Sequence, residues 1–384
     1  MTGRPHRRPA ARPLPVAGVP RPRKPRGGRD DGRRGEPHPV RALVRLRVGT
    51  TASVLVVVLG LSLVLSTAFG AEPLGLSEVG RALWGRLHGG IAVDLAADTI
   101  VWQFRVPRVL LAALVGAGLA VAGVGMQTLV RNPLADPYLL GVSSGAGVGA
   151  TAVITTGLFA SAGIFALTAG ALVGALAAAL IVFGVATAQG GLTPLRLVLT
   201  GTVLGSMFSA LASYLVFRSP DPAAAQSVLF WLLGSLAGAT WQQLLLPAAV
   251  VPAMVVLLLL GSRWLDALLV GPDTAAAVGV PVRRVRVGLF VALGVLVGVL
   301  VAVSGGIGFA GLVVPHAARL LVGPRHRAVL PVAALCGALF LVWVDVVTRV
   351  AVRPTEIPLS VVSGLIGAPA FLALLGRRRY RFGA

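Results

Sequence analysis

The chain alternates between long apolar stretches and short segments that hold nearly all of its charge. Eight stretches contain no Asp, Glu, Lys or Arg, and most of them reach the roughly 20 residues that a helix needs to cross a bilayer. They are residues 48–71, 109–130, 137–195, 197–217, 222–262, 287–318, 328–344 and 357–376. The pattern predicts an all-α polytopic membrane protein.

The third, fifth and sixth of these stretches are too long for one span. The third divides near 156–163, and the sixth divides at Ser304-Gly305-Gly306, because paired glycines cost a helix heavily unless a turn is wanted. The fifth is expected to hold a short helix at about 227–236 and then a span from Trp241. The total is ten transmembrane helices.

Composition agrees with this prediction, and the location of the charges gives an orientation. Of the 384 residues, 56% are hydrophobic and only 12% are charged, which is too apolar for a soluble domain of this length. Twenty-seven of the thirty-four Arg and Lys residues fall on one side of the ten predicted spans, and seven fall on the other. Positive residues mark the cytoplasmic side, so both termini are expected inside (N-in, C-in).

Residues 1–47 hold fourteen of these cations and are rich in Arg, Pro and Gly. Such a segment cannot bury a core, so we expect a disordered cytoplasmic tail followed by a ten-span domain over 48–384. The tail fits either contact with anionic lipid or RNA, or a solvated extension that sets topology, and the second interpretation is favoured. We expect the lipid bilayer as a partner and no nucleic acid.

Several kinds of chemistry are absent from the sequence. Only Asp345 lies well inside a predicted span, and Arg349 one turn later predicts a local ion pair rather than an ion-coupling site. The only lysine, Lys24, lies in the tail, so there is no phosphate-binding loop and any ATPase must be another chain. The five histidines form no ligand cluster, and the single Cys336 excludes an internal disulfide. We expect no catalytic residue, no metal and no cofactor.

The turn between the second and third predicted spans carries the most specific motif. Arg105-Val-Pro-Arg108 leads into one span, and Arg131-Asn-Pro-Leu-Ala-Asp-Pro-Tyr-Leu-Leu-Gly-Val-Ser-Ser-Gly-Ala-Gly147 leads into the next. The prolines stop one helix and start the other, since the residue before proline avoids the helical conformation and proline suits a first turn. A tight inner turn and a glycine-lined helix are expected.

These strings closely resemble the permeases of the iron-siderophore and vitamin B12 ABC import family (FecCD-type), whose signatures are R-x-P-R and N-P-L-A-x-P-x-x-L-G-x-S-x-G-A. The resemblance continues in order from about Ser53 to Arg379, through Trp231–Gly238, Gly305–Arg319, Asp345–Arg349 and Glu356–Pro369. It implies the type II ABC importer architecture in the cytoplasmic membrane. The partners it implies are an identical or paralogous second permease, two cytoplasmic ABC ATPases and an extracytoplasmic substrate-binding protein.

The resemblance implies transport of a ferric siderophore, with cobalamin or haem as alternatives within the family. The alternative from another class is a self-sufficient secondary transporter or channel. That alternative would require a midplane ionisable group, which the sequence lacks.

The loop at about 263–284 resembles the coupling helix that inserts into the ATPase. Pro272 is expected to start a short helix here and Gly279 to end it. The resemblance gives as ATPase contacts Asp273, Thr274, Ala277 and Gly279.

Two further sets of residues receive roles from the resemblance. Arg105, Arg108 and Arg349 match outer arginines that meet acidic residues of the binding protein, a role that suits the planar guanidinium fork. The span 197–217 resembles the helix that lines the translocation path, and the turn before it resembles the cytoplasmic gate. The path and gate candidates are Thr193, Pro194, Leu195, Thr200 and Gly201.

Overall fold

A computed structural model describes residues 39–70, 72, 74–88 and 94–376. The helical bundle belongs to a compact unit that begins at Leu43. Most of the predicted tail, 1–47, lies outside the described residues. Helix α1 (Pro39–Ser66) nevertheless begins before the predicted first span, because Val, Leu, Ala and Arg over 40–47 are compatible with a helix that extends beyond the apolar stretch.

Each of the ten predicted spans contains a helix. These helices are α1, α4 (Val106–Val130), α5 (Val142–Thr156), α6 (Ala166–Ala188), α7 (Pro194–Arg218), α9 (Trp241–Leu260), α12 (Val282–Ser304), α13 (Ala310–Val322), α14 (His326–Val350) and α15 (Leu359–Gly376). Among the described residues, seven helical stretches are long and apolar enough to cross a membrane. Helices α5, α13 and α15 fall short of that length.

Helices α5 and α13 are short because the chain before each of them runs through the bundle without forming a regular α-helix. The segment 131–141 contains only the 3₁₀ turn η2 (Pro137–Leu140), and 305–309 connects α12 to α13. A Cβ on Gly311 would meet both Pro137 Cγ, at 2.6 Å, and Leu119 O, at 3.1 Å, in the middle of α4. The predicted tight turn is therefore longer and reaches back to the middle of α4.

Side chains satisfy the backbone of these two irregular segments where they meet. Tyr138 accepts a hydrogen bond from Ile307 N–H (2.8 Å) and donates one to Ile307 C=O (3.0 Å). Ser360, at the start of α15, donates to Gly306 C=O at 2.7 Å. In the interior of a membrane protein, non-helical backbone is tolerated only where such partners exist or where it lines a cavity.

Glycines bring the long helices into direct backbone contact. A Cβ on Gly116 of α4 would lie 2.1 Å from Gly337 O on α14, and one on Gly149 of α5 would lie 2.0 Å from Gly170 O on α6. Close approach of this kind is how helices associate in lipid, where burial of apolar side chains gives little drive. Helix α4 lies at the centre, with 20 of its 25 residues buried.

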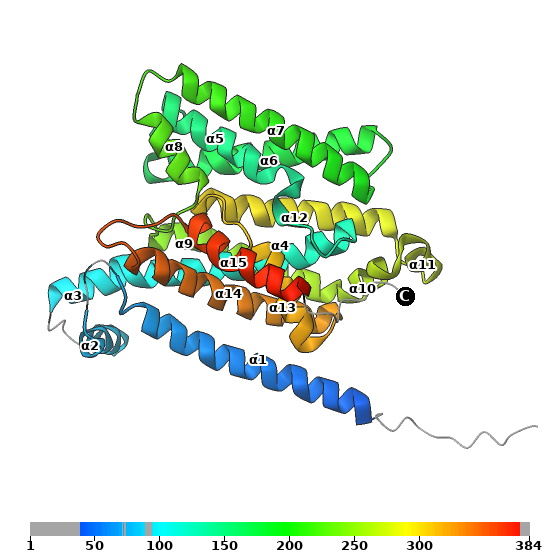
Figure 1. Cartoon of the computed structure of the whole chain (residues 1–384), viewed down its shortest axis with the longest axis horizontal. Coiled ribbons are helices and arrows are strands. Elements are labelled where there is room, and N and C mark those ends of the chain that lie inside the picture. The colour runs from blue at the N-terminus through cyan, green and yellow to red at the C-terminus, as the bar shows by residue number, and fades with distance from the viewer. Residues whose placement is uncertain (1–38, 71, 73, 89–93, 377–384) are drawn as a thin grey trace, which may run out of the picture. The chain divides into compact units, whose positions relative to one another are not determined.

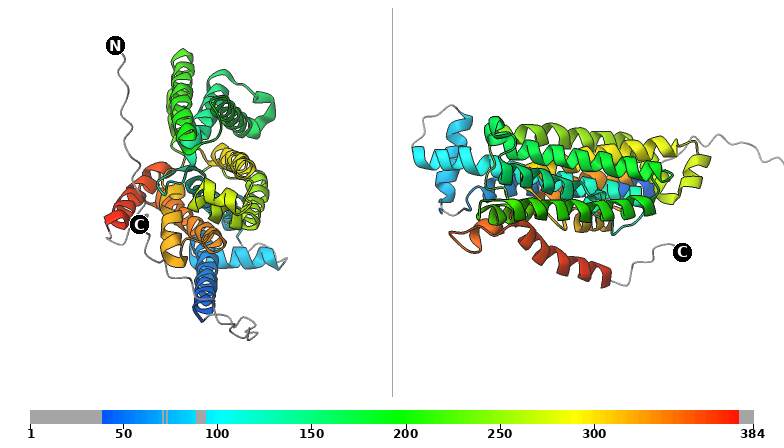
Figure 2. Two further views of the ribbon diagram at one scale, coloured as in Figure 1. Left: turned by 90° about the vertical axis from the view of Figure 1, so that its right-hand side faces the viewer. Right: turned by 90° about the horizontal axis from the view of Figure 1, so that it is seen from above.

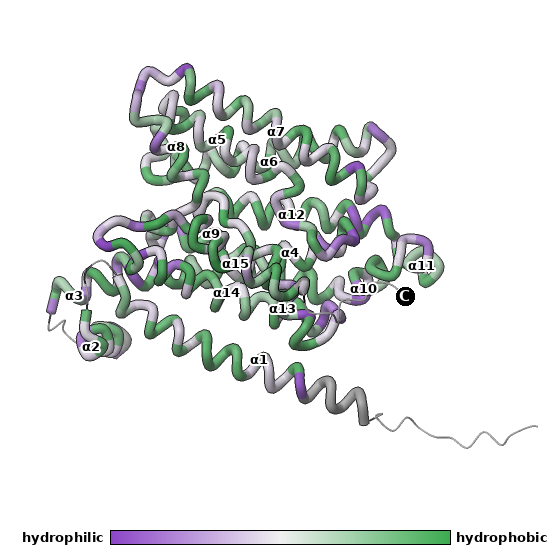
Figure 3. Tube along the Cα trace, in the orientation of Figure 1, coloured by the Kyte–Doolittle hydropathy of each residue, from purple (hydrophilic) through white to green (hydrophobic). Residues whose placement is uncertain are grey.

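The long helices run side by side, and short helices cover the two ends of the bundle (Figures 1 and 2). One end, the α2 end, carries α2 (Leu76–Leu87), α3 (Leu95–Thr99), the π-helix η1 (Ile100–Arg105) and α8 (Ala224–Leu232). The opposite end, the α11 end, carries α10 (Ser262–Val270) and α11 (Pro272–Ala277); a further 3₁₀ turn, η3 (Ala160–Phe165), precedes α6. Polar residues gather towards these two ends, and the long helices are mainly apolar between them (Figure 3).

Candidate functional sites of a membrane transporter

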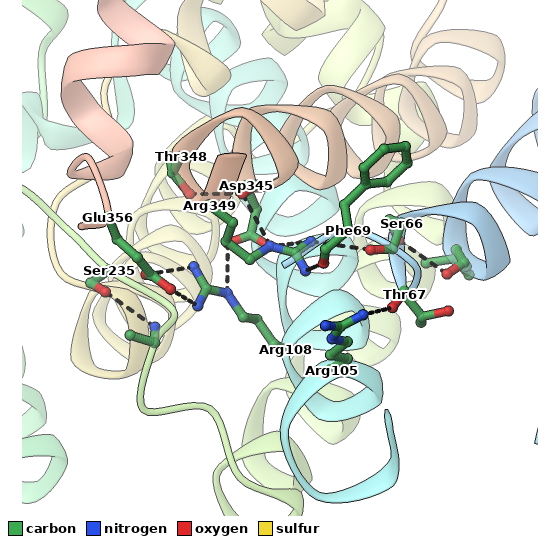
Figure 4. A network of polar contacts seen from close by, with 12 residues as sticks. Ser66, Thr67, Phe69, Arg105, Arg108, Ser235, Asp345, Thr348, Arg349 and Glu356 are labelled. Carbon is green, nitrogen blue, oxygen red and sulfur yellow. Dashed lines mark hydrogen bonds and ion pairs between the residues drawn. The ribbon is translucent and has the colours of Figure 1, made fainter. Parts of the chain in front are cut away.

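A buried cluster of charged residues lies at the α2 end, where α1, α4 and α14 meet (Figure 4). Arg108 Nε donates to Asp345 Oδ1 at 2.9 Å, and its two terminal nitrogens donate to Glu356 at 2.7 and 2.9 Å. Arg349 pairs with the other carboxylate oxygen of Asp345 at 3.0 Å. The predicted Asp345–Arg349 ion pair is confirmed, but it forms part of a larger network.

Arg349 and a further buried arginine, Arg105, bind backbone carbonyls of the segment that follows α1. Arg105 donates to Thr67 C=O (2.9 Å), to Ala68 C=O (3.0 Å) and to Glu72 C=O. Arg349 donates to Phe69 C=O at 2.6 Å. Buried carbonyls of a non-helical segment need hydrogen-bond donors, and the guanidinium groups supply them.

The three arginines predicted to dock a binding protein are thus interior groups. Arg105, Arg108 and Arg349 are 5%, 7% and 4% exposed, and each is bonded within the chain. Sequence reasoning missed Glu356 as the two-pronged partner of Arg108, although Glu356 opens the motif that ends at Pro369. The available signal was that Glu356, an acidic residue with no predicted ion-pair partner, falls on the same predicted side of the membrane as Arg108.

At the α11 end, α10 and α11 form a hairpin with a small core of its own, made of Leu268, Ala275 and Val280. The predicted short helix is confirmed: it begins at Pro272, and Gly279 follows its end with a φ of +82°, a conformation that favours glycine. The four predicted ATPase contacts, Asp273, Thr274, Ala277 and Gly279, are all exposed, whereas Ala275 between them is fully buried.

Helix α7 presents a row of hydroxyl groups beside two hollows. One hollow, of about 520 Å³, is lined by Asp136, Tyr138 and the α7 residues Thr202, Ser206 and Ser209. The other, of about 400 Å³, continues along the same helix, and its polar lining residues are Ser143, Ser144, Ser209 and Ser213. Together they form a weakly polar surface along α7, which carries no formal charge except that of Asp136.

The predicted path and gate residues divide between two faces of α7. Thr200 is 6% exposed and belongs to the packed face. Gly201 is packed so closely that a Cβ there would lie 1.9 Å from Leu139 O, but it also lines the hollow of about 520 Å³. Leu195 is exposed, while Thr193 and Pro194 are half-buried at the first turn. The hydroxyl row starts at Thr202, two residues after Thr200, and the helical period of α7 places these two residues on different faces.

These features define the class of protein: a multi-pass membrane transporter with irregular segments in its interior and a projecting hairpin at one end. Comparison with known proteins identifies the family. The FecCD transport family matches residues 56–377, and the chain belongs to this family of ABC importer permeases of the cytoplasmic membrane.

Named relatives differ in what their names say they carry. The vitamin B12 import system permease BtuC of Vibrio cholerae is 43% identical over 72% of this chain and 83% of its own. The molybdate import system permease MolB of Haemophilus influenzae is 37% identical over 84% of this chain and 94% of its own. An uncharacterised permease of Bacillus subtilis, YvrB, is also 37% identical, over 83% and 91%.

Solved structures support the fold. A metal-chelate type ABC transporter in an inward-facing conformation is 33% identical, with a TM-score of 0.75 over 85% of this chain and 99% of that one. PsaBC from Streptococcus pneumoniae is 18% identical with a TM-score of 0.50, over 79% of this chain, and shares the fold alone.

Proposed function

We propose that this chain is the ten-span, N-in and C-in permease of an ATP-driven importer that carries a metal chelate. Each predicted span contains a helix, and α5 and α13 extend into irregular segments that lengthen their course through the bundle. The α11 end holds the starts of α10, α12 and α14 and the end of α4, and these termini carry Arg131, Arg263, Arg283, Arg284, Arg286, Arg325 and Arg327. A basic end of this kind supports a cytoplasmic orientation.

The observation that carries the proposal is the α10–α11 hairpin. It stands at the end of the bundle on a small core of its own and exposes Asp273, Thr274, Ala277 and Gly279. A short helix held rigidly with small and polar side chains outward suits insertion into a cleft of a partner protein. The partner proposed is a cytoplasmic ABC ATPase, present in two copies beneath a pair of permeases.

The translocation path is proposed to follow the hydroxyl row of α7, which faces a second permease copy or a paralogue. A bulky chelate must move along this surface without being bound tightly, so hydroxyl groups that form only weak hydrogen bonds are suitable for lining the path. Thr193, Pro194 and Leu195 at the start of α7 remain gate candidates, since Thr193 and the glycines before it line a hollow of about 460 Å³ with Arg283 and Arg286.

An extracytoplasmic binding protein is proposed to dock on the α2 end. Because Arg105, Arg108 and Arg349 are bonded inside the chain, they support that surface by holding the end of α1 and the loop that carries Glu356. Exposed cations at this end, Arg218 and Arg353, are the groups better placed to meet acidic residues of the binding protein. A comparison of binding-protein affinity for Arg353→Ala and Arg105→Lys would separate the two roles.

Ferric siderophore and cobalamin are the two substrates that we propose to test first. The family resemblance of the sequence favours a ferric siderophore, whereas the B12 permease among the relatives favours cobalamin. Haem is the third candidate chelate, and the molybdate permease makes molybdate a further arm.

The experiment is uptake of radiolabelled cobalamin, ferric siderophore, haem and molybdate by cells that lack the chain, with and without the restored gene. Restoration of one uptake identifies the substrate. Uptake that is unchanged by deletion in the cobalamin, siderophore and haem arms contradicts the metal-chelate proposal, and loss of molybdate uptake alone would replace it with oxyanion import. A variant with Asp273–Gly279 replaced by a glycine-serine linker then tests the ATPase contact, because full uptake by that variant would contradict it.

A further inference from the structure

A carboxylate, an imidazole and a hydroxyl from three helices form a hydrogen-bonded chain at the α11 end. His326 opens α14 and is 1% exposed, although Arg325 and Arg327 on either side of it are exposed. Its Nδ1 lies 2.6 Å from Oδ1 of Asp266 on α10, and its Nε2 lies 2.7 Å from Oγ1 of Thr128 on α4. We call these three residues the latch.

One proton of the latch can be assigned from its partners. A carboxylate only accepts hydrogen bonds, so Nδ1 of His326 donates to Asp266. The Thr128 hydroxyl lies within hydrogen-bond distance of both Nε2 of His326, at 2.7 Å, and Val124 C=O, at 2.9 Å. Each ring nitrogen of His326 thus has a polar partner on another helix, Asp266 on α10 and Thr128 on α4.

Asp266 also supports the first turn of α14 directly. The same oxygen, Oδ1, accepts a bond from His326 N–H at 2.9 Å, one of the donors that a helix N-terminus leaves without a partner. Burial by itself would raise the pKa of Asp266, but the hydrogen bonds from the ring and backbone of His326 outweigh it and lower the pKa. The carboxylate is thus held ionised, where it complements the positive end of the α14 dipole.

The latch joins the proposed ATPase-contact hairpin to α4 and α14, two helices in direct backbone contact. Helix α10, which carries Asp266, packs on α11 and shares a hairpin with it. Helices α4 and α14 are in backbone contact at Gly116 and Gly337 and are held by the Arg108–Asp345 ion pair near their far ends. The latch fastens the near end of the same pair.

We propose that the latch transmits movement of the α10–α11 hairpin to the α4–α14 pair, with Asp266, His326 and Thr128 as positioning residues for coupled transport. This inference rests on the proposed contact of α11 with an ATPase. A displacement of the hairpin would pull on α14 and α4 together, and the α4–α14 pair reaches from the α11 end to the arginine cluster at the α2 end. The chain of contacts is continuous in the structure, so the hairpin is connected directly to both helices through side-chain hydrogen bonds.

A role limited to stability explains the latch less well. The Asp266 side chain is 39% exposed, and ion pairs open to water contribute little to stability, so a stabilising role alone would not require these groups. Hydrogen bonds with fixed donors and acceptors specify one relative position of three helices, which apolar contacts would not do as sharply.

The test uses the permease reconstituted in lipid vesicles with its ATPase and binding protein, with cyanocobalamin as the first probe and the chelate identified by the uptake assay if it differs. The measured quantity is substrate imported per ATP hydrolysed. Thr128→Val removes the hydroxyl while keeping the shape of the side chain, and Thr128→Ser keeps it. Thr155→Val is the matched control, because the Thr155 hydroxyl donates to Thr151 C=O within α5. Asp266→Asn removes the charge.

Thr128→Val and Asp266→Asn are expected to lower the ratio by about two- to thirty-fold, the usual range for residues that carry coupling, while Thr128→Ser and the control keep it. Unchanged ratios in Thr128→Val and Asp266→Asn would overturn the proposal. Loss of import in the α11 linker variant together with unchanged ratios in these two would refute the latch alone. Normal import by the linker variant would refute the proposed ATPase contact, and the latch proposal with it. If Asp266→Asn does not assemble, the Thr128 pair decides.

Discussion

Arg108 on α4 and Asp345 on α14 form a buried ion pair, with Nε and Oδ1 2.9 Å apart and the Asp345 side chain fully buried. Each residue has a second charged partner, Glu356 for Arg108 and Arg349 for Asp345. The pair therefore joins α4, α14 and the loop before α15 at one point.

Loss of one member of this network should destabilise the protein. Arg108→Ala removes one of the two cations that pair with the fully buried Asp345 carboxylate, and it also removes the two-pronged partner of Glu356, which is partly exposed. Removing one partner of a buried ion pair costs up to about 3–5 kcal/mol, and Arg349, which remains beside Asp345, reduces this cost. Thermal unfolding of the purified Arg108→Ala variant in detergent should show a clear loss of stability. The free energy of unfolding of Arg353→Ala, at an exposed position, should stay within about 0.5 kcal/mol of the parent value. Equal melting of the two variants would contradict this role for the cluster.

Two Gly→Ala substitutions should change the stability of the protein differently, one at the glycine contact between α4 and α14 and one at a glycine with open space around it. A Cβ at Gly116 would lie 2.1 Å from Gly337 O, so Gly116→Ala must push the helices apart and should cost about 1–3 kcal/mol. Gly288 in α12 has open space around its Cβ position, so Gly288→Ala should be neutral or stabilise by up to about 1 kcal/mol. Denaturation of the two variants side by side checks this, and destabilisation by both to the same extent would be inconsistent with it.

Acid should weaken the latch. Because the pKa of Asp266 is lowered in the folded protein, the carboxylate adds stability above about pH 4, its ordinary value, and this contribution is lost as the pH falls through the lower folded value. The difference in melting temperature between the parent and Asp266→Asn should thus be largest near neutral pH and shrink below about pH 4. A difference that grows on acidification would show that the carboxylate is not held ionised.

The hydroxyl row of α7 should tolerate small residues and not large ones. Ser206→Trp places an indole in the hollow beside α7 and is expected to block most uptake without preventing assembly of the complex. Leu180→Trp on α6 adds the same bulk at another exposed position and should leave uptake near the parent level. If Leu180→Trp blocks uptake and Ser206→Trp does not, the path does not run along the hydroxyl row of α7.

The sequence predicts the helices well and their contacts less well. Each of the predicted spans contains a helix, and the divisions near 156–163 and at Ser304–Gly306 are confirmed, because charge and paired glycine are strong local signals. The depth of the irregular segment around Pro137 was not predictable, since it depends on Tyr138 meeting Ile307 from the other half of the chain. Proline placement signals a break but not its position across the membrane.

The candidate sites show the same contrast between local signals, which predict structure, and tertiary contacts, which the sequence does not predict. The α11 helix follows from Pro272 and Gly279, which are local signals. The burial of Arg105, Arg108 and Arg349 does not, because an arginine beside a span can point to water or inward, and only tertiary partners such as Glu356 decide. Thr200 shows that a position on the predicted path helix does not decide which face a side chain occupies, since that depends on where η2 packs. Asp266 and His326 are 60 residues apart and gave no signal by spacing.

The most direct test of ATP-coupled import is uptake by vesicles that contain the permease, its ATPase and the binding protein, measured with ATP inside and with a non-hydrolysable analogue instead. We expect substrate accumulation with ATP, none with the analogue, and loss of ATP-driven accumulation when Asp273–Gly279 is replaced by a glycine-serine linker. Accumulation without ATP hydrolysis, or by the permease alone, would contradict ATP-coupled import and identify a self-sufficient transporter or channel.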